Sequence, residues 1–253
     1  MTIRITACLD CKFEQGIPFV VKGVKFENLQ IMGKPEELAE QYYKQGADEI
    51  CFLDITATIE SRKTMSNALK KASKRVFVPL TAGGGIKTIE DAKKLFKSGA
   101  DRVTINSAAI KRPELISEIA DKFGKQACVV AIDAKKTAKG FECRINSGKT
   151  ETGVGVVEWA KECEKLGAGE ILLTSFDRDG TKKGFDLKLI KSVRKKVSVP
   201  LIASGGAGSK KDFLDAVKTG ADAVLAAGIF QRKELTITEV KEYLKKNGIK
   251  VRL

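Results

Sequence analysis

The chain has 253 residues, with 46 lysines and arginines against 32 aspartates and glutamates, and its formal net charge is +14. It contains no run of about 18 apolar residues and its first residues lack the layout of a signal peptide, so we expect a cytoplasmic protein without a membrane span. Because the sequence contains no histidine, Ser-His-Asp and Cys-His catalysis and histidine-ligated metals are excluded.

Short apolar runs alternate along the chain with longer segments of helical period. The runs predict strands at residues 5–10, 49–55, 78–82, 102–106, 128–133, 170–176, 199–204 and 223–227. The helical period predicts helices at residues 35–45, 62–74, 88–98, 113–123, 156–166, 187–195 and 210–219. Near-continuous apolar strands are typical of parallel strands covered by helices. Eight such units in one α/β chain of this length predict a (β/α)8 barrel; the alternative is a doubly wound open sheet.

The sequence repeats itself at an offset of 121 residues (199 against 78). The segment Val-Pro-Leu-Thr-Ala-Gly-Gly-Gly at 78–85 returns as Val-Pro-Leu-Ile-Ala-Ser-Gly-Gly at 199–206. Self-similarity over half a chain predicts two equivalent halves, which we place at about 1–123 and 124–253. No linker rich in proline or serine separates them, so we expect the two halves to form one barrel domain.

Two links after predicted strands are longer than the rest, at residues 11–28 and 135–154, and they occupy equivalent positions in the two halves. Long connections at the C-terminal ends of barrel strands are commonly functional loops. We therefore expect both to lie over the mouth of the barrel.

The lysines are spread over the predicted helices, and aromatic residues are not interleaved with them as nucleic-acid binding by stacking requires. The charge fits a solvated surface or attraction of an anionic, phosphorylated substrate. The spacing Cys8-x-x-Cys11 is that of a metal or redox pair. Residues three apart on a strand face opposite ways, however, and no second pair completes a zinc site. We expect reduced, structural cysteines, no metal and no cofactor.

Matched carboxylates end two equivalent strands. In a (β/α)8 barrel the active site lies at the C-terminal ends of the strands, where the repeat places Asp10 and Asp133 on the two sides of the mouth. A single aspartate at a strand end commonly caps a loop, but a pair at two-fold positions favours catalysis. Two carboxyl groups serve as acid and base when their surroundings separate their pKa values.

Glycine-rich turns follow further equivalent strands. Residues 83–85 and 205–206 are glycines, and the next strands end in Asn106-Ser107 and Ala227-Gly228. Glycines let backbone N–H groups surround a phosphate, and the region after the last two strands is the usual phosphate site of this fold. Tight turns alone explain one such glycine. Two equivalent pairs of loops predict two phosphate sites.

Motifs along essentially the whole chain resemble one family. They are Ala-Cys-Leu-Asp at 7–10, Val-Val-Lys-Gly at 20–23, Phe-Glu-Asn-Leu at 26–29, Phe-Leu-Asp-Ile-Thr-Ala at 52–57, Arg-Lys-Thr at 62–64, Gly-Gly-Gly-Ile at 83–86, Val-Ala-Ile-Asp-Ala-Lys at 130–135, Gly-Glu-Ile-Leu-Leu-Thr-Ser at 169–175 and Asp-Arg-Asp-Gly-Thr at 177–181. The chain resembles the cyclase subunits of imidazole glycerol phosphate synthase, of histidine biosynthesis.

The resemblance implies a lyase reaction. Ammonia from a partner glutaminase subunit passes through the barrel to a phosphoribulosyl-formimino aminoimidazole carboxamide ribonucleotide. The products are imidazole glycerol phosphate and the aminoimidazole carboxamide ribonucleotide. Asp10 and Asp133 are implied as the acid–base pair, without an assignment of which donates at each step.

The resemblance also implies the binding residues. Substrate contacts fall on Lys22, Asp54, Thr174 and Ser204. One phosphate falls on Gly85, Asn106 and Ser107, and the other on Asp179, Gly180, Gly206, Ala227 and Gly228. An ammonia gate of strand-start charges falls on Arg4, Glu49, Arg102 and Glu170, beside Asp101, which would face the glutaminase.

Two alternatives stay open at this point. The related sugar isomerase of the same pathway shares the half-barrel repeat, both phosphate sites and the paired aspartates. The motif at 52–57 and the strand-start charges favour the cyclase. A catalytically silent barrel that only binds a partner is the second alternative, and replacement of Asp10 or Asp133 by asparagine separates it from an enzyme.

Overall fold

Eight parallel strands close into a barrel in the computed structural model, which describes residues 2–14, 16–24, 27–55 and 66–253. The strands pair in chain order and the last pairs with the first. They are β1 (Arg4–Glu14), β4 (Glu49–Asp54), β5 (Leu80–Gly83), β6 (Arg102–Ile105), β7 (Cys128–Thr137), β10 (Glu170–Ser175), β11 (Leu201–Ser204) and β12 (Ala223–Ala226). The predicted (β/α)8 barrel is confirmed, and the open sheet is excluded by the closure.

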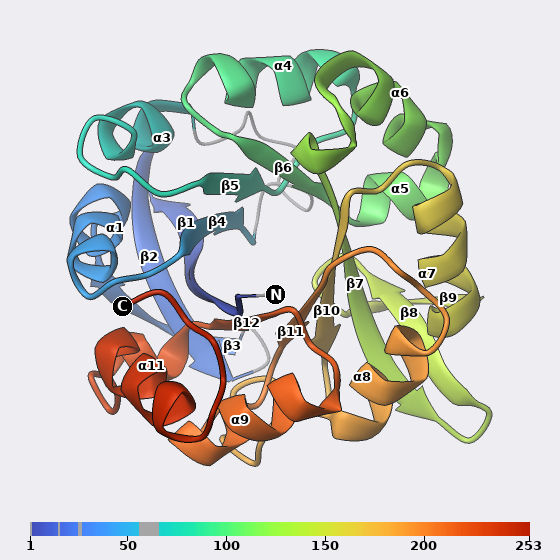
Figure 1. Cartoon of the computed structure of the whole chain (residues 1–253). Coiled ribbons are helices and arrows are strands. Elements are labelled where there is room, and N and C mark those ends of the chain that lie inside the picture. Colours follow the sequence, from blue (N-terminus) through green and yellow to red (C-terminus); the bar gives the residue numbers. More distant parts are fainter. Residues whose placement is uncertain (1, 15, 25–26, 56–65) are drawn as a thin grey trace.

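Helices form a ring around these strands (Figure 1). They are α1 (Pro35–Lys44), α3 (Ser66–Ala72), α4 (Ile89–Lys97), α6 (Glu114–Phe123), α7 (Val156–Lys165), α8 (Leu187–Arg194), α9 (Lys210–Thr219) and α11 (Ile237–Lys246). Thr88 and Asp91 cap the start of α4 with a reciprocal capping box. Residues 62–65 of the second predicted helix, the whole motif at 62–64, and parts of the motifs at 26–29 and 52–57 lie outside the described residues.

Strand alternation divides the core into two parts. Side chains at odd positions of β1, such as Ile5 and Leu9, pack outward against the helices in the larger apolar cluster. Side chains at even positions point into the barrel, where Cys8 belongs to a smaller cluster. The other buried members of that inner cluster are Cys51, Val129, Leu172, Ile202, Ala223 and Leu225. This inner cluster lies along the barrel axis, and its members Cys8, Leu172 and Leu225 also line the pocket at the mouth.

The two long links are folded as β-structure, which the sequence analysis missed. β2 (Ile17–Val24) and β3 (Glu27–Gly33) extend β1, and β8 (Gly140–Ile145) and β9 (Thr150–Gly155) extend β7, all with antiparallel pairing. In β8 the apolar residues Phe141, Cys143 and Ile145 alternate with charged ones, which is the period of a half-buried strand. The equivalent placement of the two excursions carries over into equivalent hairpins.

Both ends of the described chain meet at the N-terminal end of the barrel. Ile3 forms a parallel bridge with Val251, and its N–H donates to the Lys250 carbonyl at 2.9 Å. Lys241 of α11 is 1% exposed, and its ammonium lies 2.7 Å from Asp48 Oδ1. These contacts fasten the end of the chain to the residue before β1, and α11 to the residue before β4.

Candidate active site

A pocket with a volume of about 500 Å³ opens at the C-terminal ends of the barrel strands. Every residue that the sequence analysis placed at the mouth lines it. These residues are Asp10, Lys22, Asp54, Gly85, Asn106, Ser107, Asp133, Thr174, Asp179, Gly180, Ser204, Gly206, Ala227 and Gly228. Residues scattered over most of the sequence thus form one concave site, as expected of this fold.

Asp10 is held on one side of the mouth by β1 and is 6% exposed. The ammonium of Lys22, which β2 folds back over the mouth, lies 2.9 Å from Asp10 Oδ2. The thiol of Cys8 donates to Asp10 Oδ1 at 3.4 Å. Burial opposes the Lys22 charge, but Asp10 and Asp179 hold the pKa of Lys22 above its ordinary value. The two side chains therefore form an ion pair largely shielded from water.

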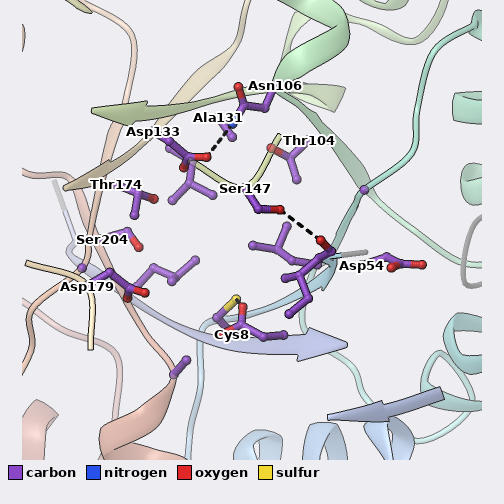
Figure 2. Close-up of a pocket in the computed structure, with 18 of the residues that line it drawn as sticks. Cys8, Asp54, Thr104, Asn106, Ala131, Asp133, Ser147, Thr174, Asp179 and Ser204 are labelled. Atoms are coloured by element: carbon purple, nitrogen blue, oxygen red, sulfur yellow. Dashed lines mark hydrogen bonds between the residues drawn. The ribbon is translucent and has the colours of Figure 1, made fainter. Parts of the chain in front are cut away.

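Asp133 occupies the equivalent position at the end of the inward face of β7. Its Oδ2 accepts a hydrogen bond from Asn106 Nδ2 at 2.9 Å (Figure 2). Burial raises the pKa of Asp133 to about 7; the Asn106 bond opposes the rise and the charge of Asp179 adds to it. The two aspartates thus have different neighbours, an ammonium at Asp10 and a neutral amide at Asp133. A carboxyl that titrates near neutrality suits proton transfer.

The raised pKa makes stability depend on pH. In the folded state Asp133 keeps its proton up to about pH 7, whereas the unfolded chain releases it near pH 3.8. The stabilisation is complete below the unfolded pKa and is lost as the pH rises through the folded one. The free energy of unfolding of the wild type is therefore expected to fall relative to that of Asp133→Asn between about pH 4 and about pH 7. Urea unfolding of both proteins across this range measures the difference, and a constant difference would contradict the prediction.

The first glycine-rich loop, expected to bind a phosphate, follows β5. Gly84 has φ +98°, and a Cβ there would lie 2.2 Å from the Asp54 carbonyl oxygen, so only glycine fits the turn. The loop places Gly85 in the pocket beside Ser107, the first residue of the short helix α5 (Ser107–Lys111). The backbone of the glycine turn and the hydroxyl of Ser107 thus face the same space.

The second glycine-rich loop is its counterpart after β11. Gly206 has φ +108°, and a Cβ there would lie 2.2 Å from the Gly184 carbonyl oxygen. Gly180 lines this side of the pocket, and so does Gly228, the first residue of the short helix α10 (Gly228–Gln231). The sequence analysis missed both short helices and the cations that line the pocket near the loops, which are Lys87, Lys111, Arg112, Lys182 and Arg232.

Asp54 and Asp179 were both expected in the site, and each differs from that expectation, Asp54 in the direction of its carboxylate and Asp179 in its neighbour. Asp54 lies in the pocket wall, but Figure 2 shows its carboxylate directed away from the centre of the cluster. It shares the outward face of β4 with Phe52, which belongs to the outer core. Asp179, expected at a phosphate, lies close enough to Lys22 that this ammonium opposes the rise in the Asp179 pKa caused by burial.

The four strand-start charges form a closed ring at the opposite end of the barrel. Arg4 and Arg102 each pair with Glu49, at 2.9 and 3.1 Å. Both also pair with Glu170, Arg102 at 3.0 Å and Arg4 through a guanidinium–carboxylate contact. Arginine and glutamate therefore alternate around the ring, and we call these four residues the basal ring.

Asp101 lies beside the basal ring and is exposed. Its Oδ2 accepts a hydrogen bond from the Leu80 N–H at 2.8 Å. The same contact recurs elsewhere at this end of the barrel, from the Ile5 N–H to Asp48 and from the Leu201 N–H to Asp222. The Asp101 carboxylate thus anchors the start of β5 in addition to presenting a charge at the surface.

The histidine biosynthesis protein family matches residues 4–236. Three curated relatives named imidazole glycerol phosphate synthase subunit HisF match over nearly their full lengths. That of Natranaerobius thermophilus is 51% identical over 99% of this chain and 98% of its own, that of Bifidobacterium longum 50% over 100% and 99%, and that of Clostridium botulinum 52% over 100% of both. The chain belongs to the HisF family.

Membership of the HisF family confirms the resemblance inferred from the motifs. The relatives' name describes each of them as a subunit of a synthase. All six cysteines are free and buried, and Cys8 and Cys11 belong to the inner and outer clusters, as strand alternation predicted.

Two further findings concern the described residues of this HisF-family chain. They contain no group of three or more cysteine, aspartate or glutamate residues placed to hold a metal ion. None of their helices has the length and hydrophobicity needed to cross a membrane.

Proposed function

We propose that this chain is the cyclase subunit of imidazole glycerol phosphate synthase. It converts phosphoribulosyl-formimino aminoimidazole carboxamide ribonucleotide and ammonia into imidazole glycerol phosphate and the aminoimidazole carboxamide ribonucleotide. The observation that carries the proposal is the mouth itself: Asp10 beside an ammonium and Asp133 beside an amide line one pocket with two glycine-rich loops. A substrate with a phosphate at each end matches this two-fold arrangement.

The chemistry is acid–base catalysis by the two carboxyl groups. The phosphates bind at the loops that contain Gly85 and Gly206, which fixes the reacting centre of the substrate between Asp10 and Asp133. Asp133, with a pKa raised to about 7, exchanges a proton with the substrate near neutral pH. Lys22 stabilises the Asp10 carboxylate, while Thr174 and Ser204 contact the substrate between the phosphates.

Ammonia enters at the basal ring and reaches the mouth through the barrel interior. Along the interior, the hydroxyl of Thr6 and that of Thr104, which lines the pocket, are buried, and no described residue hydrogen-bonds to either. Such hydroxyls suit a small polar molecule passing along the axis. The partner is a glutaminase that docks at the N-terminal end of the barrel near Asp101, and the complex works in the cytoplasm. The barrel itself consists of two similar halves, at about 1–123 and 124–253.

Incubation of the pure chain with the ribulosyl substrate and an ammonium salt tests the function. We expect imidazole glycerol phosphate to form, and glutamine without a glutaminase to give none, because the chain has no histidine to activate a nucleophilic cysteine. A second assay, with the ribosyl isomer of the substrate, tests whether the chain is instead the related sugar isomerase. Isomerisation without ammonia-dependent product would refute the proposal, as would hydrolysis of glutamine by the isolated chain.

A further inference from the structure

The turn between β8 and β9 crosses from the second half of the barrel to the first. Asn146, Ser147 and Gly148 follow one another with φ of 55°, 57° and 80°. The left-handed region is unfavourable for residues with a side chain. Asparagine and glycine adopt this region readily in hairpin turns, so the unfavourable position is Ser147, which its contacts must hold.

Hydrogen bonds tie this turn to the first half of the barrel. The Asn146 N–H donates to Ser107 Oγ at 3.1 Å, and the Ser147 hydroxyl donates to the Ile55 carbonyl at 3.1 Å (Figure 2). Ser107 belongs to the first phosphate site, and Ile55 follows β4. Ser107, Ser147 and Ile55 all line the pocket.

Gly148 fixes the other end of the turn against the second half. It is buried, and a Cβ on it would lie 2.0 Å from the ring of Phe176, which directly follows β10. Glycine is therefore required here by both the conformation and the space. The turn is clamped between the end of β10 and the first phosphate site.

These contacts set the hydrogen-bonding direction of two hydroxyls. A serine hydroxyl has one proton to donate and can accept two bonds. Ser107 accepts from Asn146, and no described residue accepts its proton, so this proton is available to a ligand in the pocket. Ser147 spends its proton on Ile55, so only its lone pairs remain for a ligand.

We propose that residues 146–148 are a positioning turn for the substrate, in which the Asn146 amide orients the Ser107 hydroxyl as a donor to a phosphate and Ser147 accepts a hydrogen bond from a hydroxyl or N–H of the substrate beside that phosphate. The proposal rests on the proposed function. It explains why a strained turn of the second half is held over the first phosphate site.

Steady-state kinetics with the bisphosphorylated substrate and saturating ammonium test the role of Ser147. Loss of one hydrogen bond to a ligand is expected to raise KM about tenfold in Ser147→Ala, with a smaller change in kcat. Ser147→Gly also lacks the hydroxyl but relieves the backbone strain, and the same rise is expected. A wild-type KM in Ser147→Gly would overturn the role of the hydroxyl.

A double-mutant cycle tests whether Asn146 acts through Ser107. Asn146→Val introduces a β-branched residue that rejects the left-handed conformation, and its KM is expected to rise about tenfold, as in Ser107→Ala. Because Asn146→Val also moves the adjacent Ser147, the cycle is run with Ser147→Ala present: in the Ser107→Ala Ser147→Ala background Asn146→Val should add less than about twofold. Additive effects would overturn the proposal. Asn146→Gly keeps the N–H and the conformation, so its KM should lie well below that of Asn146→Val; equal values would count against the proposal.

Controls separate folding and function from the proposal. Thr137→Ala, at the far end of the same β-extension where Thr137 bonds the Gly140 carbonyl, is expected to keep the wild-type KM. Urea unfolding checks each variant, and if Asn146→Val does not fold, the Ser147 pair decides. If the wild type makes no product, the proposed function fails. Calorimetric titration with inorganic phosphate then applies the same cycle: non-additive weakening supports the turn, and additive weakening refutes it.

Discussion

Asp133→Asn is expected to lower kcat for ammonia-dependent formation of imidazole glycerol phosphate about 10²- to 10⁴-fold, the range typical of a lost general acid or base. Asparagine keeps the size of the side chain and can keep a hydrogen bond to Asn106 after an amide flip, so the pocket retains its shape. Asp10→Asn is expected to have an effect of the same order, because it removes the carboxylate that faces Lys22 at 2.9 Å. Single-turnover and steady-state kinetics measure both.

Asp177→Asn is the matched control. Asp177 lies near the mouth on the loop after β10 and is exposed, and its carboxylate accepts the Lys136 N–H at 2.8 Å outside the active-site pocket. Its replacement should leave kcat within about threefold of the wild type. Full turnover in both Asp10→Asn and Asp133→Asn would show that neither carboxyl transfers a proton, and the chain would then act as a partner-binding barrel.

Among the variants named here, Glu49→Ala should lower the free energy of unfolding most, by about 3 kcal/mol. The Glu49 carboxylate is 1% exposed, pairs with both arginines of the basal ring and accepts a hydrogen bond from Thr81. Its removal leaves two guanidinium groups facing each other and a cavity at the end of the barrel. Solvent reaches both arginine side chains, which are about one quarter exposed, so the loss falls at the lower end for a buried pair.

Glu118→Ala provides the comparison for Glu49→Ala. Glu118 pairs with Arg112 at 2.7 Å, but both side chains are more than two fifths exposed. An exposed pair contributes less than about 1 kcal/mol. Urea unfolding at a fixed pH should therefore separate the two variants clearly, and equal losses would refute a structural role for the basal ring.

The barrel strands were predictable because each is a short apolar run between segments of helical period. The start of α4 carries a local signal as well, since the Thr88–Asp91 capping box spans only four residues. The hairpins were missed because each lies in a segment with glycines and charges, and the alternation in β8 spans only six residues. The short helices α5 and α10 were missed because five and four residues carry no helical period.

The direction of Asp54 could have been predicted from strand period alone. Side chains on a strand alternate between its two faces, so residues an even number apart share a face. Arg4 and Asp10 share one, as do Glu170 and Thr174, and both pairs join the basal ring to the mouth along the barrel interior. Glu49 and Asp54 are five apart and face opposite ways, which matches the outward carboxylate in Figure 2.

The role of the turn at Ser147 could not have been predicted in this way. Ser147 bonds Ile55, which is 92 residues away in the sequence, and Asn146 bonds Ser107, which is 39 residues away. A left-handed conformation at Ser147 leaves no signal in the amino acid itself, since serine carries no preference for it. Asn146 and Gly148 on either side of it favour a turn, but they carry no information about which distant residues the turn contacts.

The bridge between Ile3 and Val251 places the two ends of the described chain side by side. If a few residues joined these neighbouring ends, a new opening at Gly124, a surface position with φ +89° between α6 and β7, would exchange the order of the two halves along the gene. The pairing of every strand with its neighbours would stay the same. The order in which the halves are translated is therefore not dictated by the architecture, and a circularly permuted gene should encode the same enzyme.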